Sequence, residues 1–147
     1  MRTWIILLAA VSVAGVLVHC GKKGDPVLPT AQRPGAISDL TAVSDNGSIL
    51  LQWTISGKKT DDAIFKILRS SLEIEGDECP GCPRTYYLIA ERKFQDKTLV
   101  WKSDRVVIFR DNETRGGRLY TYKIVICDAS GICSDESNIA EFKVPLK

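Results

Sequence analysis

The chain after position 35 consists of short runs of β-branched and aromatic residues that alternate with polar residues. In the run 49–54, for example, Leu51 and Trp53 alternate with polar neighbours, and no segment keeps an apolar stripe at helical spacing. An Asn-Gly pair at 46–47 separates the first two runs and favours a tight hairpin. Strands are predicted at 40–42, 49–54, 65–70, 86–90, 106–109, 120–126 and 139–144. These short strands, without a helix, predict an all-β sandwich.

Short motifs follow these runs in a fixed order. They are Pro34 with Leu40-x-Ala42, Leu51-x-Trp53, Phe65-x-Ile67-x-Arg69, Phe109-x-Asp111, Gly117-x-x-Tyr120-x-Tyr122-x-Ile124-x-Ile126-x-Asp128 with Gly131, and Ser134-x-x-Ser137-Asn138-x-Ala140. In this order and spacing they resemble the fibronectin type III domain. The resemblance implies a seven-stranded, immunoglobulin-like sandwich in which Trp53 fills the core between two sheets. It also implies that Tyr120 is the corner tyrosine, with its hydroxyl bonded to upstream backbone.

Two long connections, at 73–84 and 95–104, depart from the family pattern. Loops of a sandwich often carry its function, so both connections are candidate binding surfaces. The aromatic residues beside them, Tyr86, Tyr87 and Trp101, are the candidate contact residues. A tyrosine pair at the start of a strand also suits sheet packing, so both interpretations stay open.

The first residues have the composition of an export signal. A short basic start precedes an uncharged stretch over 4–18. This stretch is shorter than the about 20 residues that span a bilayer, and it suits a signal peptide. It ends in Leu17-Val18-His19-Cys20, which resembles the lipobox of bacterial lipoproteins, although His19 stands where Gly, Ala or Ser is usual. The resemblance implies cleavage before Cys20 and attachment of the chain to a membrane through acyl groups on that residue.

Residues 20–35 are rich in Gly, Lys and Pro, a composition typical of an extended tether. Their first ten residues also resemble the start of a small outer-membrane lipoprotein that associates with the lipopolysaccharide translocon. Asp25 interrupts this match, and a plain tether would contain similar residues. We therefore expect a lipoprotein signal peptide at 1–19, a lipid-anchored tether at 20–35 and a fibronectin type III-like domain at 36–147.

Four cysteines remain after Cys20. Export to an oxidising compartment favours two disulfides. Cys127 and Cys133 flank the turn between the last two predicted strands, where a short covalent link is geometrically easy. Cys79 and Cys82 flank a Pro-Gly turn, which brings the ends of the turn close together. We expect the pairs Cys127–Cys133 and Cys79–Cys82.

The same sulfur atoms allow two further hypotheses. Cys79 and Cys82 form a Cys-x-x-Cys motif of the kind that thiol-disulfide oxidoreductases use, although acidic neighbours at 73–78 raise the pKa of a thiol and slow its reactions. All four cysteines together would form a tetrathiolate zinc site, but Cys127 and Cys133 are spaced more widely than is usual for zinc ligands. We predict no bound metal and no cofactor.

Charge and composition narrow the function classes. The formal net charge is +2, and the basic residues are scattered along the chain. They therefore do not form the basic stripe that is typical of a nucleic-acid-binding protein. The single histidine, His19, lies in the predicted signal peptide, so a processed chain has no imidazole for catalysis or metal ligation. Phosphate-binding and nucleophile-elbow motifs are absent from the sequence. We predict no catalytic residues, no nucleic-acid partner and no small-molecule substrate.

These features together favour a lipoprotein held by Cys20 in the outer membrane and facing the periplasm; Gly21 is compatible with outer-membrane sorting. Its fibronectin type III-like domain is expected to bind or scaffold another envelope protein. Three alternatives remain open: an oxidoreductase that uses Cys79 and Cys82, a carbohydrate-binding module that uses Trp101 and the tyrosines, and an accessory lipoprotein of an outer-membrane translocon.

Overall fold

The structure is a computed structural model that describes residues 33–56, 62–74 and 83–146 of the chain. The chain divides into two units after Ala31, and every described residue belongs to the second unit. Within the described ranges there are eight strands and no helix. They are β1 (Thr41–Asp45), β2 (Ser48–Thr54), β3 (Ile64–Glu73), β4 (Tyr87–Lys93), β5 (Val100–Trp101), β6 (Val106–Asp111), β7 (Arg118–Cys127) and β8 (Ala140–Val144). None of the described residues forms a helix that is long and apolar enough to cross a membrane.

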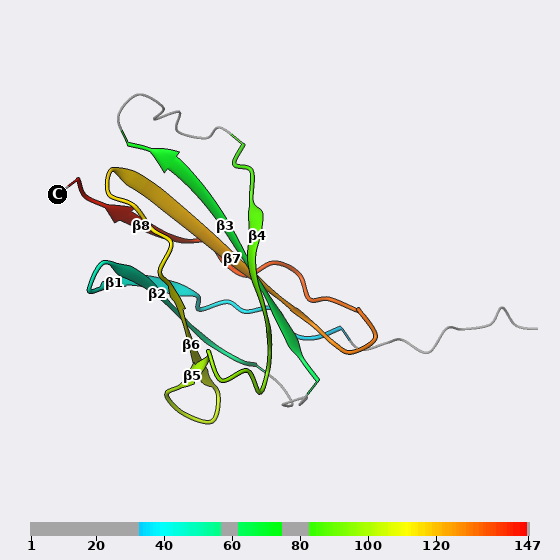
Figure 1. Cartoon of the computed structure of the whole chain (residues 1–147). Helices are drawn as coiled ribbons and strands as arrows, with labels where there is room; N and C mark the ends of the chain where they lie inside the picture. Colours follow the sequence, from blue (N-terminus) through cyan, green and yellow to red (C-terminus); the bar gives the residue numbers. More distant parts are fainter. Residues whose placement is uncertain (1–32, 57–61, 75–82, 147) are drawn as a thin grey trace, which may run out of the picture. The chain divides into compact units, whose positions relative to one another are not determined.

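The strands form two antiparallel four-stranded sheets, in the orders β1-β2-β6-β5 and β4-β3-β7-β8 (Figure 1). This arrangement confirms the predicted all-β, immunoglobulin-like sandwich, and each predicted strand is present. The structure adds one strand, β5, at the edge of the first sheet within the connection 95–104. A strand of two residues is too short to produce a periodic pattern, which is why the sequence did not predict it.

The first hairpin forms where the Asn-Gly pair predicted it. Asn46 and Gly47 both have positive φ angles, 50° and 87°, and Asp45 pairs with Ser48 across the turn. Two consecutive positive φ angles define the two-residue turn whose twist matches that of the flanking strands. The hairpin therefore fixes the register of β1 against β2.

A single apolar core lies between the sheets and takes alternate residues from both. Leu51 and Trp53 of β2 and Phe65 and Ile67 of β3 are all almost completely buried. The Trp53 ring meets the Phe65 ring edge-on, with 5.5 Å between ring centroids. Full burial of each such side chain stabilises the fold by about 1.5–3 kcal/mol relative to exposure. The alternation in the sequence thus becomes the inner face of each sheet.

The segment between β7 and β8 is held to β7 by serine hydroxyls as well as by backbone hydrogen bonds. Ser134 and Ser137 accept hydrogen bonds through Oγ from the backbone N–H groups of Ile126 and Ile124, at 3.1 and 2.9 Å. The side chain of Asn138 completes the link to the first sheet, because its Oδ1 accepts from Leu40 N at 2.8 Å and its Nδ2 donates to Leu40 O at 2.9 Å. The final serine and asparagine motif of the sequence is therefore a structural one.

Candidate functional site

The two aromatic residues that the family resemblance singles out lie in the core. Trp53 is 1% exposed, and its Nε1 has no hydrogen-bond partner among the described residues. Tyr120 is 3% exposed, and its hydroxyl accepts a hydrogen bond from Arg115 N at 2.8 Å. The bond ties the loop before β7 to the start of that strand.

One of the expected cysteine pairs lies in the described residues. Cys127 and Cys133 form a disulfide across the turn that follows β7. Asp128 organises this turn, because its Oδ1 accepts hydrogen bonds from the Ser130 side chain and from backbone N–H groups. The hydrogen bond from the Ser130 hydroxyl is the largest cause of the lowered pKa of Asp128.

The Cys127–Cys133 disulfide argues against the tetrathiolate zinc site. A tetrathiolate site needs four ionised thiols, and the disulfide leaves none at Cys127 or Cys133. In the described part of the chain, no group of three or more His, Cys, Asp or Glu side chains is placed to hold a metal ion. Cys20, Cys79 and Cys82 lie outside the described residues.

Most of the connection 95–104 is exposed, but Leu99 and Trp101 pack against the fold. Leu99 is 4% exposed, and the Trp101 ring lies against Phe94 with 4.5 Å between centroids. Asp96 accepts hydrogen bonds from the hydroxyl and the backbone N–H of Thr98, and these bonds lower its pKa. Trp101 is half-buried in this arrangement and is less accessible than its place in a loop suggests.

The two tyrosines before and in β4 have different surroundings. Tyr86 is half-buried, and the Lys123 ammonium lies 4.4 Å from the centre of its ring. Arg84, two residues earlier, forms an ion pair of 2.9 Å with Glu141 on β8. The residues just before β4 therefore reach across the outer face of the second sheet. Tyr87, in contrast, is 68% exposed at the edge strand of that sheet.

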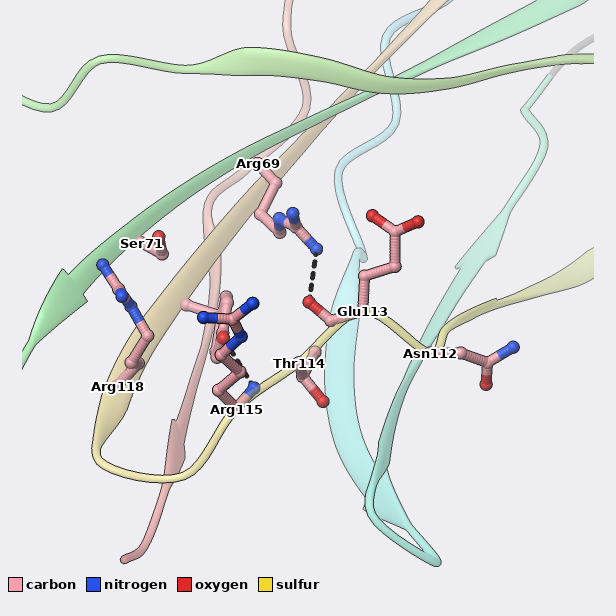
Figure 2. Close-up of a pocket in the computed structure, with 8 residues that line it drawn as sticks. Arg69, Ser71, Asn112, Glu113, Thr114, Arg115 and Arg118 are labelled. Atoms are coloured by element: carbon pink, nitrogen blue, oxygen red, sulfur yellow. Dashed lines mark hydrogen bonds between the residues drawn. The ribbon is translucent and has the colours of Figure 1, made fainter.

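A hollow of about 520 Å³ lies at the end of the sandwich where β3 and β6 end and β7 begins. Its walls include the side chains of Arg69, Arg115 and Arg118. Figure 2 shows these side chains around the hollow, with Ser71 between Arg69 and Arg118. Three guanidinium groups from two strands and one loop thus face one space.

Two further hollows adjoin the first. One, of about 410 Å³, shares Arg69 and Ser71 with it and extends to the exposed Tyr87. The other, of about 370 Å³, shares Arg115 and Arg118 and extends to Leu146. We call the three together the arginine groove, after Arg69, Arg115 and Arg118.

The loop between β6 and β7 is fixed in place by the neighbouring hairpin. Ser48 donates a hydrogen bond to Asn112 Oδ1 at 2.9 Å, and Thr114 donates one to Gly47 O at 3.1 Å. The backbone bond from Arg115 to the corner tyrosine holds the far side of the loop. Hydrogen bonds between the β1–β2 turn and the β6–β7 loop therefore hold in place the loop residues that line the arginine groove.

A buried polar network lies beneath the arginine groove. The Asp111 carboxylate accepts hydrogen bonds from Arg69 Nη1 at 2.8 and 3.1 Å, from the Tyr122 hydroxyl at 2.8 Å and from Glu113 N at 3.0 Å. Asp111 is 4% exposed and Tyr122 is completely buried. The Arg69 Nη1 also donates to Glu113 O at 3.0 Å, as Figure 2 shows. Both carboxylate oxygens therefore have more than one donor.

This network perturbs two ionisation equilibria. Burial raises the pKa of Tyr122, and the charge and the hydrogen bond of Asp111 raise it further. Burial alone would lower the pKa of Arg69, but its hydrogen bond to Asp111 and the negative charge of that residue outweigh burial, so the pKa is raised. Arg69 therefore stays cationic and Tyr122 stays neutral in the folded protein.

Arg115 and Arg118 are not part of this network. Among the described residues, no carboxylate pairs with the guanidinium of Arg115. Arg118 forms one long ion pair of 3.4 Å with Glu73, and its buried Nε has no acceptor in the described ranges. The arginine groove thus contains guanidinium N–H groups that lack acceptors.

The sequence motifs do not identify the arginine groove. Arg69 is a position of the family motif, and no motif singles out Arg115 or Arg118. The available signal was the Arg-Gly-Gly-Arg sequence at 115–118, because a loop with two glycines between two arginines places two cations close together.

Comparison with known proteins shows similarity at the level of fold. No protein-family model matches the chain, and no curated protein sequence matches it either. The twitchin kinase region of C. elegans, a chain that includes domains designated Fn31 and Ig26, has 12% identity and a TM-score of 0.52, over 78% of this chain and 17% of that one.

Two bacterial enzymes also contain similar regions. The pectate lyase Pel3 of Pectobacterium carotovorum has 18% identity and a TM-score of 0.43, over 74% of this chain and 26% of that one. The β-1,2-glucanase of Parabacteroides distasonis has 18% identity and a TM-score of 0.47, over 80% of this chain and 14% of that one. At such identities, the twitchin match shows only that this chain has a sandwich compatible with a fibronectin type III or immunoglobulin domain.

Proposed function

We propose that this chain is a lipid-anchored protein of the bacterial cell envelope, whose fibronectin type III-like domain binds another protein and performs no catalysis. The lipobox-like sequence ending at Cys20 and the Gly/Lys/Pro-rich tether support the anchor and a position in the outer membrane, facing the periplasm. The sandwich fold is compatible with a binding module. Fold alone does not define function, so the binding function is inferred from the surface of the domain.

The observation that carries the binding function is the arginine groove. It is an open surface feature in which guanidinium N–H groups have no acceptor among the described residues. An exposed tyrosine, Tyr87, lies at one end and an exposed leucine, Leu146, at the other. Arginine and tyrosine are the residue types that most often dominate the binding energy of protein interfaces. The 73–84 connection borders this groove through Glu73, Pro83 and Arg84.

The intact mass of membrane-extracted protein, alkylated without reductant, tests the anchor. We expect a species that begins at Cys20, carries acyl groups and has no alkylated thiol. The Cys20→Ala variant should carry no acyl group and should retain Met1, because the cysteine that defines the cleavage position is missing. A wild-type mass that retains Met1 would contradict the anchor. Two alkylated thiols would contradict the second disulfide and would favour the oxidoreductase hypothesis for Cys79 and Cys82.

Site-specific photo-crosslinking in cells tests the binding function. A photoreactive phenylalanine analogue in place of Tyr87 should give a discrete adduct with an envelope protein, identified by mass spectrometry. The same analogue in place of Val43, which is 52% exposed on β1 of the other sheet, serves as the matched control. Equal adducts at both positions, or none at Tyr87, would contradict a partner at this end of the sandwich.

A further inference from the structure

We infer that the arginine groove binds a carboxylate-bearing segment of the partner protein, with the carboxylate between Arg115 and Arg118 and an apolar side chain beside Leu146. This inference rests on the proposed protein-binding function and names the chemistry of its partner. Guanidinium groups bind carboxylates through short, charge-assisted hydrogen bonds.

Several donors of the arginine groove have no acceptor among the described residues. Within the described residues, the Arg115 guanidinium has no ion pair and the buried Arg118 Nε has no acceptor. The hydroxyl of Tyr120 accepts from Arg115 N, and no described group accepts its proton. Tyr120 is 3% exposed and lines the same hollow. A buried donor without an acceptor is costly. The exposed Arg115 guanidinium can donate to a bound oxyanion directly, whereas the buried Arg118 Nε and the Tyr120 hydroxyl can do so after a local rearrangement.

Among the described residues, the acidic groups near the first hollow have other hydrogen-bond partners, point away or are screened by water. Both oxygens of Asp111 accept hydrogen bonds from Arg69 and its neighbours below the groove. Figure 2 shows the Glu113 carboxylate pointing away from Arg115 and Arg118. Glu73 reaches Arg118 only at 3.4 Å, and its side chain is 67% exposed, so water screens this pair. The central hollow therefore favours an added anion.

The neighbouring hollows favour a peptide over an isolated ion. The hollow that shares Arg115 and Arg118 with the central one ends at Leu146, which is 65% exposed. A small ion would leave this leucine in water, whereas an apolar side chain next to the carboxylate would cover it. On the other side of the central hollow, the groove reaches the 68% exposed ring of Tyr87. An extended segment can contact all three hollows.

A titration followed by NMR tests this inference. The full chain, labelled with ¹⁵N in detergent, is titrated with acetyl-Gly-Asp-Leu-Gly-amide and, separately, with acetyl-Gly-Asn-Leu-Gly-amide. We expect saturable shifts of the Arg115 and Arg118 signals with the aspartate peptide, and affinity at least about tenfold weaker for the asparagine peptide, which lacks the charge. Arg115→Gln and Arg118→Gln should each weaken the aspartate peptide about tenfold. Arg105→Gln, which removes an exposed arginine outside the groove, should leave the affinity unchanged.

Five results would overturn the inference. Equal binding of both peptides, or equal weakening by Arg105→Gln, would show that the carboxylate is not recognised in the arginine groove. Glycerol phosphate that binds saturably where the aspartate peptide does not would reassign the site to a phosphate. Peptide binding that appears only after Glu75→Gln, Asp77→Asn and Glu78→Gln are combined would assign the groove to the chain's own acidic residues. Crosslinking at Tyr87 together with no peptide binding would leave the proposed function standing and reject this inference alone.

Discussion

Arg69 and Arg115 line the same hollow, yet their guanidinium groups have opposite surroundings. Arg69 meets the buried carboxylate of Asp111, which also accepts from the Tyr122 hydroxyl. Arg115 is exposed and pairs with no carboxylate among the described residues. An arginine that has a buried acceptor in the fold therefore stabilises the sandwich, and an arginine without one is available to a ligand. The residue type is the same in both cases.

Removal of the Asp111 carboxylate, which Arg69 and Tyr122 share, should have the largest effect on the free energy of unfolding. We expect Asp111→Ala to lower the free energy of unfolding by about 3–5 kcal/mol, because it leaves the Arg69 charge and the Tyr122 hydroxyl without their buried partner. Urea denaturation at neutral pH measures this loss. Asp45→Ala, which breaks the more exposed pair with Arg110, is the matched control and should cost less than about 1 kcal/mol. Equal losses would show that the buried network has no special role.

Tyr122→Phe should destabilise the fold less than Asp111→Ala, because it removes a single hydrogen bond from the same network. The substitution keeps the ring and removes one hydrogen bond to a carboxylate, so we expect a loss of about 1.5–3 kcal/mol at neutral pH.

The pH dependence gives the Tyr122 prediction a second readout. Because the pKa of Tyr122 is raised in the folded protein, the unfolded chain releases this proton first when the pH rises. Stability from this residue is therefore complete below about pH 10 and is lost above it, with a slope of about 1.4 kcal/mol per pH unit. Between about pH 9 and 11, the free energy of unfolding should fall less steeply with pH for Tyr122→Phe than for the wild type. Parallel curves would contradict the raised pKa.

Gly117→Ala should have an intermediate effect at the Leu146 end of the groove. Gly117 has a φ of +76°, and a Cβ there would lie 2.9 Å from Leu146 Cδ2. We expect a loss of about 1–2 kcal/mol from the left-handed backbone, with an added cost from moving Leu146. Gly131→Ala is the control, because its φ is +84° and no atom would lie within 4 Å of the new Cβ. A larger loss at Gly131 in thermal denaturation would reject close packing at Gly117.

Arg115→Gln should have the smallest effect on stability. We expect a change below about 0.5 kcal/mol, because the side chain has no partner among the described residues. Arg105→Gln provides the reference for the loss of an exposed positive charge. A loss at Arg115 that approaches the one expected for Asp111→Ala would place this arginine in the structural network and contradict the comparison.

The fold was predictable because its signals are local. Alternation of apolar and polar residues marks the inner faces of strands such as β2, and the pair Asn46-Gly47 determines a hairpin within four residues. The short strand β5 gave no such signal, since it depends on pairing with β6.

The candidate site was less predictable because it depends on tertiary contacts. The local sequence places Arg69 on a strand and Arg115 in a loop, but it does not show that Arg69 meets a carboxylate 42 positions away. Tyr86 and Tyr87 are adjacent in sequence, yet the first packs against Lys123 because the preceding residues cross the sheet, and the second remains exposed. The twisted end of a sandwich brings such residues together only after folding.

The most direct test of the central comparison is ¹⁵N relaxation of the arginine side chains in the full chain, because it reports how firmly each guanidinium is held. We predict a rigid Nε–H for Arg69 and a mobile one for Arg115, with Arg115 becoming rigid when the aspartate peptide is added. An Arg115 signal as rigid as that of Arg69 in the absence of peptide would contradict the claim that one arginine belongs to the fold and the other to a partner.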